Sequence, residues 1–166
     1  MRRFLTALIA GIFAVLLAAS AAVADSARFH YANASTTSSG ALKVNFKETG
    51  LGTTVSTETV TLTVTNASAD YQCWNHGGKH PQAGNKETVS TQIVDPNTFP
   101  VRNGQVTAAI TVGPAGPGDF TCPGGQTLYL MSATYSGISL SGQAGTIAAT
   151  PDPVSTGPIM IKVSGR

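Results

Sequence analysis

The chain has 166 residues, of which 42% are hydrophobic and 11% are charged, with 18 glycines and 9 prolines. Its formal net charge of +2 comes from ten basic and eight acidic side chains, and two of the basic ones, Arg2 and Arg3, stand at the very start. The rest of the chain is therefore neutral, with no cluster of Lys and Arg, which argues against nucleic acid as a partner.

The N-terminus has the three parts of an export signal. A basic start precedes an apolar run over residues 4–19, and Ala22 and Ala24 then form an Ala-x-Ala cleavage site. The run is short for a membrane-spanning helix, which needs about 20 apolar residues. We expect residues 1–24 to be removed and the product to be secreted, or periplasmic if the source has an outer membrane. Residues 159–166 include no hydrophobic tail, so no membrane contact is expected after cleavage.

The two cysteines, Cys73 and Cys122, are expected to form a disulfide, because the chain is bound for an oxidising compartment. Closing a loop of about 50 residues stabilises a domain by roughly 4 kcal/mol in the chain-entropy description. A metal-thiolate site would need the close CxxC spacing that is missing here. The bridge is expected to pin two sheets together, or to tether the irregular regions beside the two cysteines.

Apolar and polar residues alternate over several short stretches that are rich in Thr, Val, Ser and Ala. Such alternation is typical of half-buried β-strands, and the Gly, Pro and Asn residues between the stretches are typical of turns. The pattern predicts an all-β fold, an antiparallel β-sandwich that is immunoglobulin-like in a loose sense and carries one disulfide. The predicted strands are 42–47, 59–65, 71–74, 89–93, 106–112, 128–135 and 138–140.

The domain organisation follows from where this alternation begins and ends. After the signal, residues 25–40 are expected to be a flexible segment, residues 41–141 the β-sandwich, and residues 142–166 a tail with one edge strand or none. Two stretches inside the sandwich are predicted as loops. Residues 75–86 contain no strand pattern, and residues 113–125 hold several Gly and Pro.

The loop that leaves Cys73 is the first candidate for a binding surface. It begins with Trp74 and Asn75 and contains His76 and His80. Two imidazoles four residues apart could face one metal ion on a helix, but Gly77-Gly78 between them and the following proline disfavour a helix. No third ligand lies nearby in the sequence. Solvated loop histidines are therefore the expected state, with no metal and no cofactor, and a metal-binding loop is the alternative.

Aromatic side chains could add a platform for a sugar or for a partner protein. The candidates are Tyr71, Trp74, Tyr129 and Tyr135, and the competing interpretation is that most of them pack in the core.

No catalytic residue is predicted. The chain has no Gly-x-Ser-x-Gly elbow, and neither His nor Met follows Cys122 closely as a copper site of the cupredoxin type requires. Two acids could still meet in space as a glycosidase pair, which leaves a hydrolase as a further alternative. Nothing in the sequence selects two from Asp25, Glu48, Glu58, Asp70, Glu87, Asp95, Asp119 and Asp152.

Two strings around the cysteines resemble a group of short, uncharacterised, exported bacterial proteins of the actinomycete type. The first runs from Tyr71 to Lys86 and reads YQCWN, then GG, HPQA and NK; the second runs from Gly116 to Leu128 and reads GPGDFTCP, then GQTL. The resemblance implies one disulfide-stapled domain and brings no catalytic residue with it. The expected function is thus that of a secreted, non-catalytic β-domain that binds a cell-wall, polysaccharide or protein surface.

Overall fold

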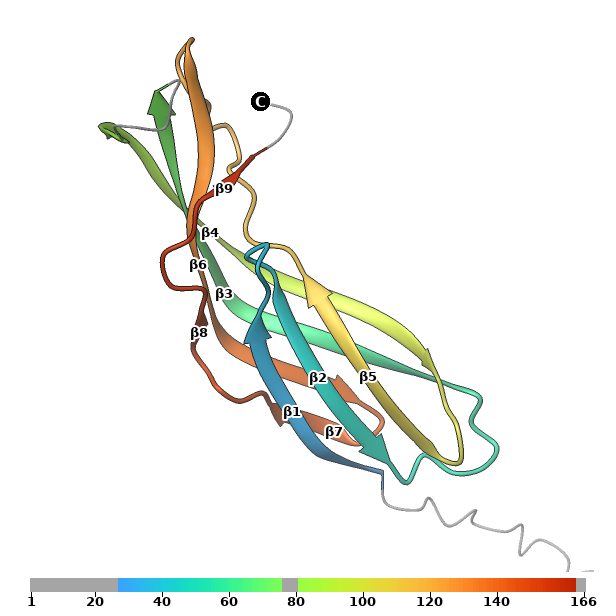
Figure 1. Cartoon of the computed structure of the whole chain (residues 1–166). Coiled ribbons are helices and arrows are strands. Elements are labelled where there is room, and N and C mark those ends of the chain that lie inside the picture. Colours follow the sequence, from blue (N-terminus) through green and yellow to red (C-terminus); the bar gives the residue numbers. More distant parts are fainter. Residues whose placement is uncertain (1–26, 76–80, 164–166) are drawn as a thin grey trace, which may run out of the picture.

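The computed structural model describes residues 27–75 and 81–163, and all regular structure in these two ranges is β (Figure 1). One sheet has the order β1-β2-β5, and the other has the order β4-β3-β6-β7, with β8 and β9 also pairing with β6. Every pair of strands is antiparallel. The first sheet consists of β1 (Arg28–Thr36), β2 (Leu42–Thr49) and β5 (Gln105–Val112). The second consists of β3 (Thr57–Asn75), β4 (Pro81–Pro100), β6 (Gln126–Gly142), β7 (Gly145–Ala148), β8 (Val154–Ser155) and β9 (Ile161–Lys162).

The apolar residues of the alternating stretches face the inside of a sandwich of two sheets, and the polar residues between them face outward. In β3, Val60, Leu62 and Val64 are fully buried, whereas the threonines between them face outward. The same holds in β2, where Leu42 to Phe46 supply every second residue to the core. The β-branched and aliphatic side chains of both sheets form one large apolar cluster, which confirms the predicted antiparallel sandwich.

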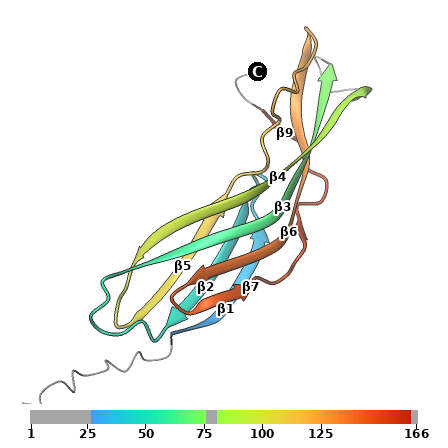
Figure 2. The same ribbon diagram turned by 180° about the vertical axis from the view of Figure 1, so that it is seen from behind.

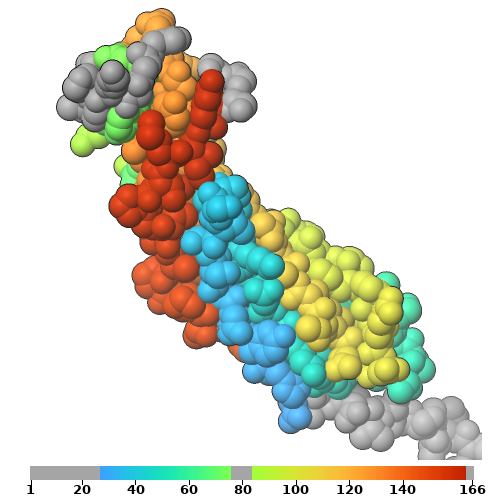
Figure 3. Space-filling model, viewed as in Figure 1, coloured from blue at the N-terminus to red at the C-terminus, as the bar shows by residue number. Residues whose placement is uncertain are grey.

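The strands β3, β4 and β6 are much longer than the strands of the first sheet, and they continue beyond the end of that sheet (Figures 1 and 2). We call this continuation the arm and define it as residues 69–75 of β3, 81–90 of β4 and 126–132 of β6. In the space-filling view it projects past the blue and cyan strands of the sandwich (Figure 3). Its inner face carries a second apolar cluster, which includes Tyr71 and Leu128. Residues of the 113–125 loop pack against this cluster, and so does Ile161 of β9, the strand that pairs with β6 at the edge of the sheet.

The disulfide lies in the arm. Cys73 and Cys122 are joined with a Cα–Cα distance of 5.6 Å, and Cys73 is fully buried in the second apolar cluster. The bridge therefore ties the 113–125 loop, which crosses from one sheet to the other, to the middle of the arm. The expectation that it joins two sheets directly was wrong, and the expected tethering of the Gly/Pro-rich loop is confirmed.

Three segments have more regular structure than the sequence predicts. Residues 25–40, expected to be flexible, contain β1, whose core-facing side chains are the small Ala32 and Ala34. The predicted tail 142–166 contains β7, β8 and β9. Strand β4 begins at Pro81, inside the stretch predicted as a loop, and continues through Pro96. A proline fits there because β4 pairs on one side only and forms the edge of its sheet.

Two buried tyrosines connect the strands to the turns that cover them. The hydroxyl of Tyr135 donates to the carbonyl of Gly40 at 2.7 Å, and the hydroxyl of Tyr71 donates to the carbonyl of Ala115 at 2.6 Å. Burial raises the pKa of Tyr135 to about 12 and also raises the pKa of Tyr71. Both phenols therefore stay protonated and keep these hydrogen bonds over the physiological pH range.

Candidate functional site

The outer face of the arm brings together two of the four predicted aromatic residues. Successive residues of β3 face opposite sides, so Cys73 points into the second apolar cluster and Trp74 points outward. Thr127 pairs with Trp74, and Tyr129 lies two residues further along β6, on the same face. The Trp74 and Tyr129 rings meet edge to face, with centroids 6.4 Å apart and planes at 73°. Both side chains are partly exposed.

Polar side chains surround this aromatic pair. Gln72 lies between Lys86 on β4 and Tyr129 on β6 in the register of the sheet. The indole Nε1 of Trp74 is buried and has no hydrogen-bond partner in the part of the chain that the structure describes. The outer face of the arm thus combines aromatic rings with amide, ammonium and hydroxyl groups.

Next to the aromatic pair, Asp70 is held by two hydroxyl groups from neighbouring strands. Ser132 and Thr88 each donate a hydrogen bond to it. These bonds, first Ser132 and then Thr88, lower the pKa of the Asp70 carboxyl, and the charge of Lys86 acts in the same direction. A hollow of about 410 Å³ opens here, lined by Asp70, Tyr71, Gln72, Lys86, Glu87, Thr88 and Met131.

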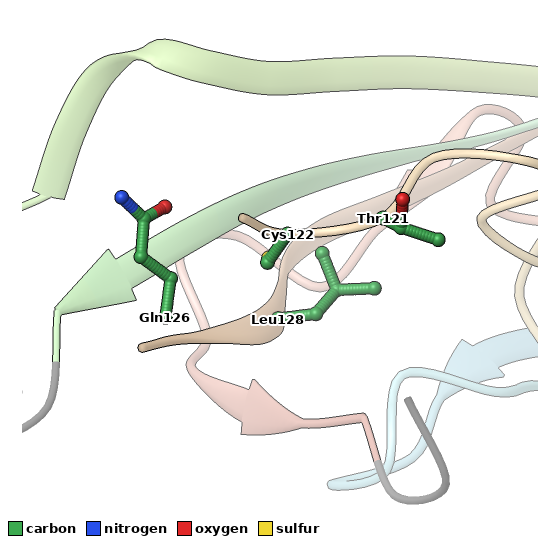
Figure 4. Close-up of a pocket in the computed structure, with 4 residues that line it drawn as sticks. All are labelled: Thr121, Cys122, Gln126 and Leu128. Carbon is green, nitrogen blue, oxygen red and sulfur yellow. The ribbon is translucent and has the colours of Figure 1, made fainter. Parts of the chain in front are cut away.

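The inner side of the arm has a smaller cavity beside the disulfide. Its volume is about 250 Å³, and its lining comes from the 113–125 loop and from β6 (Figure 4). The amide of Asn85 donates to the side-chain oxygen of Gln126, one of the lining residues, at 3.0 Å. Both cysteines are bonded to each other, so this cavity offers no thiol chemistry. The residues that line it are Thr121, Cys122, Gln126 and Leu128.

The predicted candidates have different outcomes. Trp74 and Tyr129 form the outer aromatic pair, whereas Tyr71 and Tyr135 are buried and serve the core and the turns. Asn75 is exposed at the end of β3. His76 and His80 lie outside the described residues, so the metal-binding loop stays a prediction. Within residues 27–75 and 81–163, no group of three or more His, Cys, Asp or Glu side chains could hold a metal ion.

Two of the eight acids do meet in space. Glu48 at the end of β2 is fully buried, and Glu58 at the start of β3 is 8% exposed. Their carboxylates accept hydrogen bonds from the backbone amides of Ala144 and Gln143, in the turn between β6 and β7. Burial is the main cause that raises the pKa of Glu48, and the neighbouring Glu58 adds to it. A substrate cannot reach carboxylates that are sealed beneath a hairpin, so this pair does not favour the hydrolase alternative.

The sequence contains a signal for this pair. Glu48 follows Leu42, Val44 and Phe46 in the alternation of buried positions, and Glu58 precedes Val60 in the same way. Each glutamate therefore occupies an inward-facing position.

Among the described residues, no helix is long and apolar enough to cross a membrane. Comparison with known proteins finds no matching family model, no matching curated protein and no matching solved structure.

Proposed function

We propose that this protein is an exported, non-catalytic domain that binds polysaccharide through the outer face of the arm, at a cell surface or in the medium. The observation that supports this proposal is the partly exposed pair Trp74 and Tyr129 on the outer face of the sheet formed by β4, β3, β6 and β9. Aromatic rings have electron-rich faces, which attract the C–H groups of a sugar ring. The polar groups of Gln72, Lys86 and Thr127 lie beside the rings, where they can bond to sugar hydroxyls.

The surface around the pair suits a sugar better than a protein. Protein interfaces have an apolar centre with several anchoring side chains. In the described ranges, the large hydrophobic side chains that are exposed are Val94, in the part of β4 beyond the arm, and Met160, next to β9. Val94 lies away from the aromatic pair, and Met160, two residues before the Lys162 that pairs with Tyr129, adds a single apolar side chain beside it. The balance of eight basic and eight acidic residues after removal of Arg2 and Arg3 favours a neutral polysaccharide over a polyanion.

The proposal also states that the protein is exported. It is supported by the basic and apolar start of the chain and by the disulfide, since such bonds persist in oxidising compartments. Expression of the full gene in a secreting bacterial host should release a protein whose N-terminal residue, read by mass spectrometry, is Asp25. Retention of the full-length chain inside the cells would contradict export.

The binding proposal is tested by retention of the mature domain on a panel of insoluble polysaccharides and purified cell walls. The double variant Trp74→Ala/Tyr129→Ala should lose affinity by about tenfold or more, because aromatic anchors carry much of the binding energy at such sites. Tyr31→Ala is the matched control. Tyr31 is a partly exposed tyrosine of the first sheet, and its removal should leave retention unchanged.

Two outcomes of this experiment would overturn the proposal. One is retention that the double variant and the Tyr31→Ala control keep to the same degree. The other is the absence of retention on every polysaccharide, together with capture by an immobilised surface protein.

A further inference from the structure

Glu48 and Glu58 lie where three parts of the fold meet. Glu48 belongs to the first sheet and Glu58 to the second, and the turn of the β6–β7 hairpin closes over both. The amide of Gln143 donates to Glu58 Oε1 at 2.7 Å, and the amide of Ala144 donates to Glu48 Oε1 at 2.8 Å. The two carboxyl groups therefore connect both layers of the sandwich to one hairpin.

The two carboxyl groups face the same small region beside Gly142. A Cβ atom added to Gly142 would lie 3.0 Å from Glu58 Oε1, 3.2 Å from Glu48 Oε2 and 3.3 Å from Glu48 Oε1. Oxygens of both groups thus surround one small region above the backbone of Gly142. In the described part of the chain, Glu48 Oε2 is buried and has no hydrogen-bond partner.

Among residues 27–75 and 81–163, no cation is among the groups that act on the pKa of Glu48. Charged and titratable side chains of the neighbouring elements face away from it: Arg28 and His30 on β1 are exposed, and His30 bonds to Thr49 at the surface. Lys47 has the opposite orientation to Glu48 because it is the adjacent residue of β2. Arg102, before β5, is exposed and bridges to Gln105 through its backbone. Glu58 is the charged group whose field acts on Glu48.

A charged Glu48 is costly here, because its carboxyl group is buried, the neighbouring Glu58 repels its charge, and its Oε2 has no hydrogen-bond partner among the described residues. A proton on Glu48 removes that charge. We propose that Glu48 retains a proton in the folded protein, and that this proton makes the junction of the hairpin with the two sheets a pH-sensitive clasp. Loss of the proton leaves two buried negative charges under the hairpin, so the clasp loosens as the pH rises.

The direction of the pH dependence follows from the pKa of Glu48. Burial raises this pKa in the folded protein above the value of about 4.3 for an unfolded glutamate. The folded state therefore binds the proton more strongly than the unfolded state. The resulting stability is fully present below the unfolded pKa and is lost as the pH rises through the folded pKa. The expected loss thus extends upward from about pH 4.3.

The test compares the melting temperature of the mature wild-type domain with that of Glu48→Gln between pH 4.5 and 8. The wild type should lose about 3–6 °C as the pH rises through this range. Glu48→Gln keeps the shape and the acceptor for Ala144 but carries no charge, so its melting temperature should change less and should exceed that of the wild type at pH 8. Asp70→Asn is the control, because the lowered pKa of Asp70 acts in a more acidic range, and this variant should keep the wild-type slope above pH 5.

A second measurement needs no variant. The chain has three glutamates, and the exposed Glu87 serves as an internal reference in a ¹³C NMR titration of the side-chain carboxyl carbons. The Glu48 signal should move at a pH above that of a free glutamate. Equal pH slopes for the wild type and Glu48→Gln, or a Glu48 carboxyl that titrates like a free glutamate, would refute the retained proton.

Discussion

Replacement of both Cys73 and Cys122 by alanine is expected to unfold the arm while the sandwich stays folded. The bridge closes a loop of 49 residues and lies in the second apolar cluster, away from the main core. Its removal should cost roughly 4 kcal/mol, by the loop-closure entropy of the unfolded state. The cluster it stabilises is small, so the cost should appear there first.

Hydrogen exchange read by mass spectrometry checks this expectation. Amides in residues 69–75, 113–125 and 126–132 should lose protection by up to about a thousandfold in the variant, which corresponds to about 4 kcal/mol. Amides of β2 and β5 should lose distinctly less protection, because these strands lie in the main core away from the bridge. An equal loss of protection in both groups would show that the arm and the sandwich unfold as one unit, and no loss in either would show that the bridge is dispensable.

Gly137→Ala is expected to destabilise the domain by about 2–4 kcal/mol. Gly137 has φ of +65°, a conformation that L side chains rarely adopt. An added Cβ would also lie 2.4 Å from Thr65 Oγ1 and 2.6 Å from Thr65 Cβ, across the β3–β6 pair. Thr65 cannot simply move aside, because its hydroxyl bonds to the carbonyl of Gly137. The free energy of unfolding by urea measures the effect.

Gly145→Ala separates the cost of the positive φ from the cost of the contact with Thr65. Gly145 has φ of +86°, but an added Cβ there would meet no atom within 4 Å. This variant should therefore show only the conformational cost, about 1 kcal/mol. A second comparison is Thr65→Ala/Gly137→Ala, which should recover part of the loss. Equal destabilisation by Gly137→Ala and Gly145→Ala would show that the contact with Thr65 contributes nothing.

The elements that the sequence predicts well are those with a strong apolar alternation. Val60, Leu62 and Val64 in β3 are an example, because a wrong register would expose all three side chains. Strand β1 was not predicted, because its inward positions are occupied by small alanines, which give only a weak apolar alternation. The first half of β4 was not predicted either. It pairs with β3, beginning with Pro81 opposite Trp74, through backbone hydrogen bonds, and its sequence has no apolar alternation.

The candidate site was predictable in part. Trp74 faces outward because the adjacent Cys73 faces the core, which follows from the sequence of a strand alone. Its neighbour Tyr129 depends on the β3–β6 register, which includes a bulge between Asp70 and Tyr71 that no sequence pattern marks. The sequence places Glu48 and Glu58 each at an inward position of its strand. That they meet could not be predicted, because it depends on how the two sheets and the β6–β7 hairpin come together.

Trp74 is the only tryptophan of the chain, so its fluorescence and its single indole N–H signal report directly on the outer face of the arm. The most direct test of the proposed function is a titration of the mature domain with soluble oligosaccharides cut from the polysaccharide that retains it. Polysaccharide binding through this face predicts a saturable change of the Trp74 signals, absent in Tyr129→Ala and unchanged in Tyr31→Ala. A ligand that binds while the Trp74 signals stay constant would contradict the proposal.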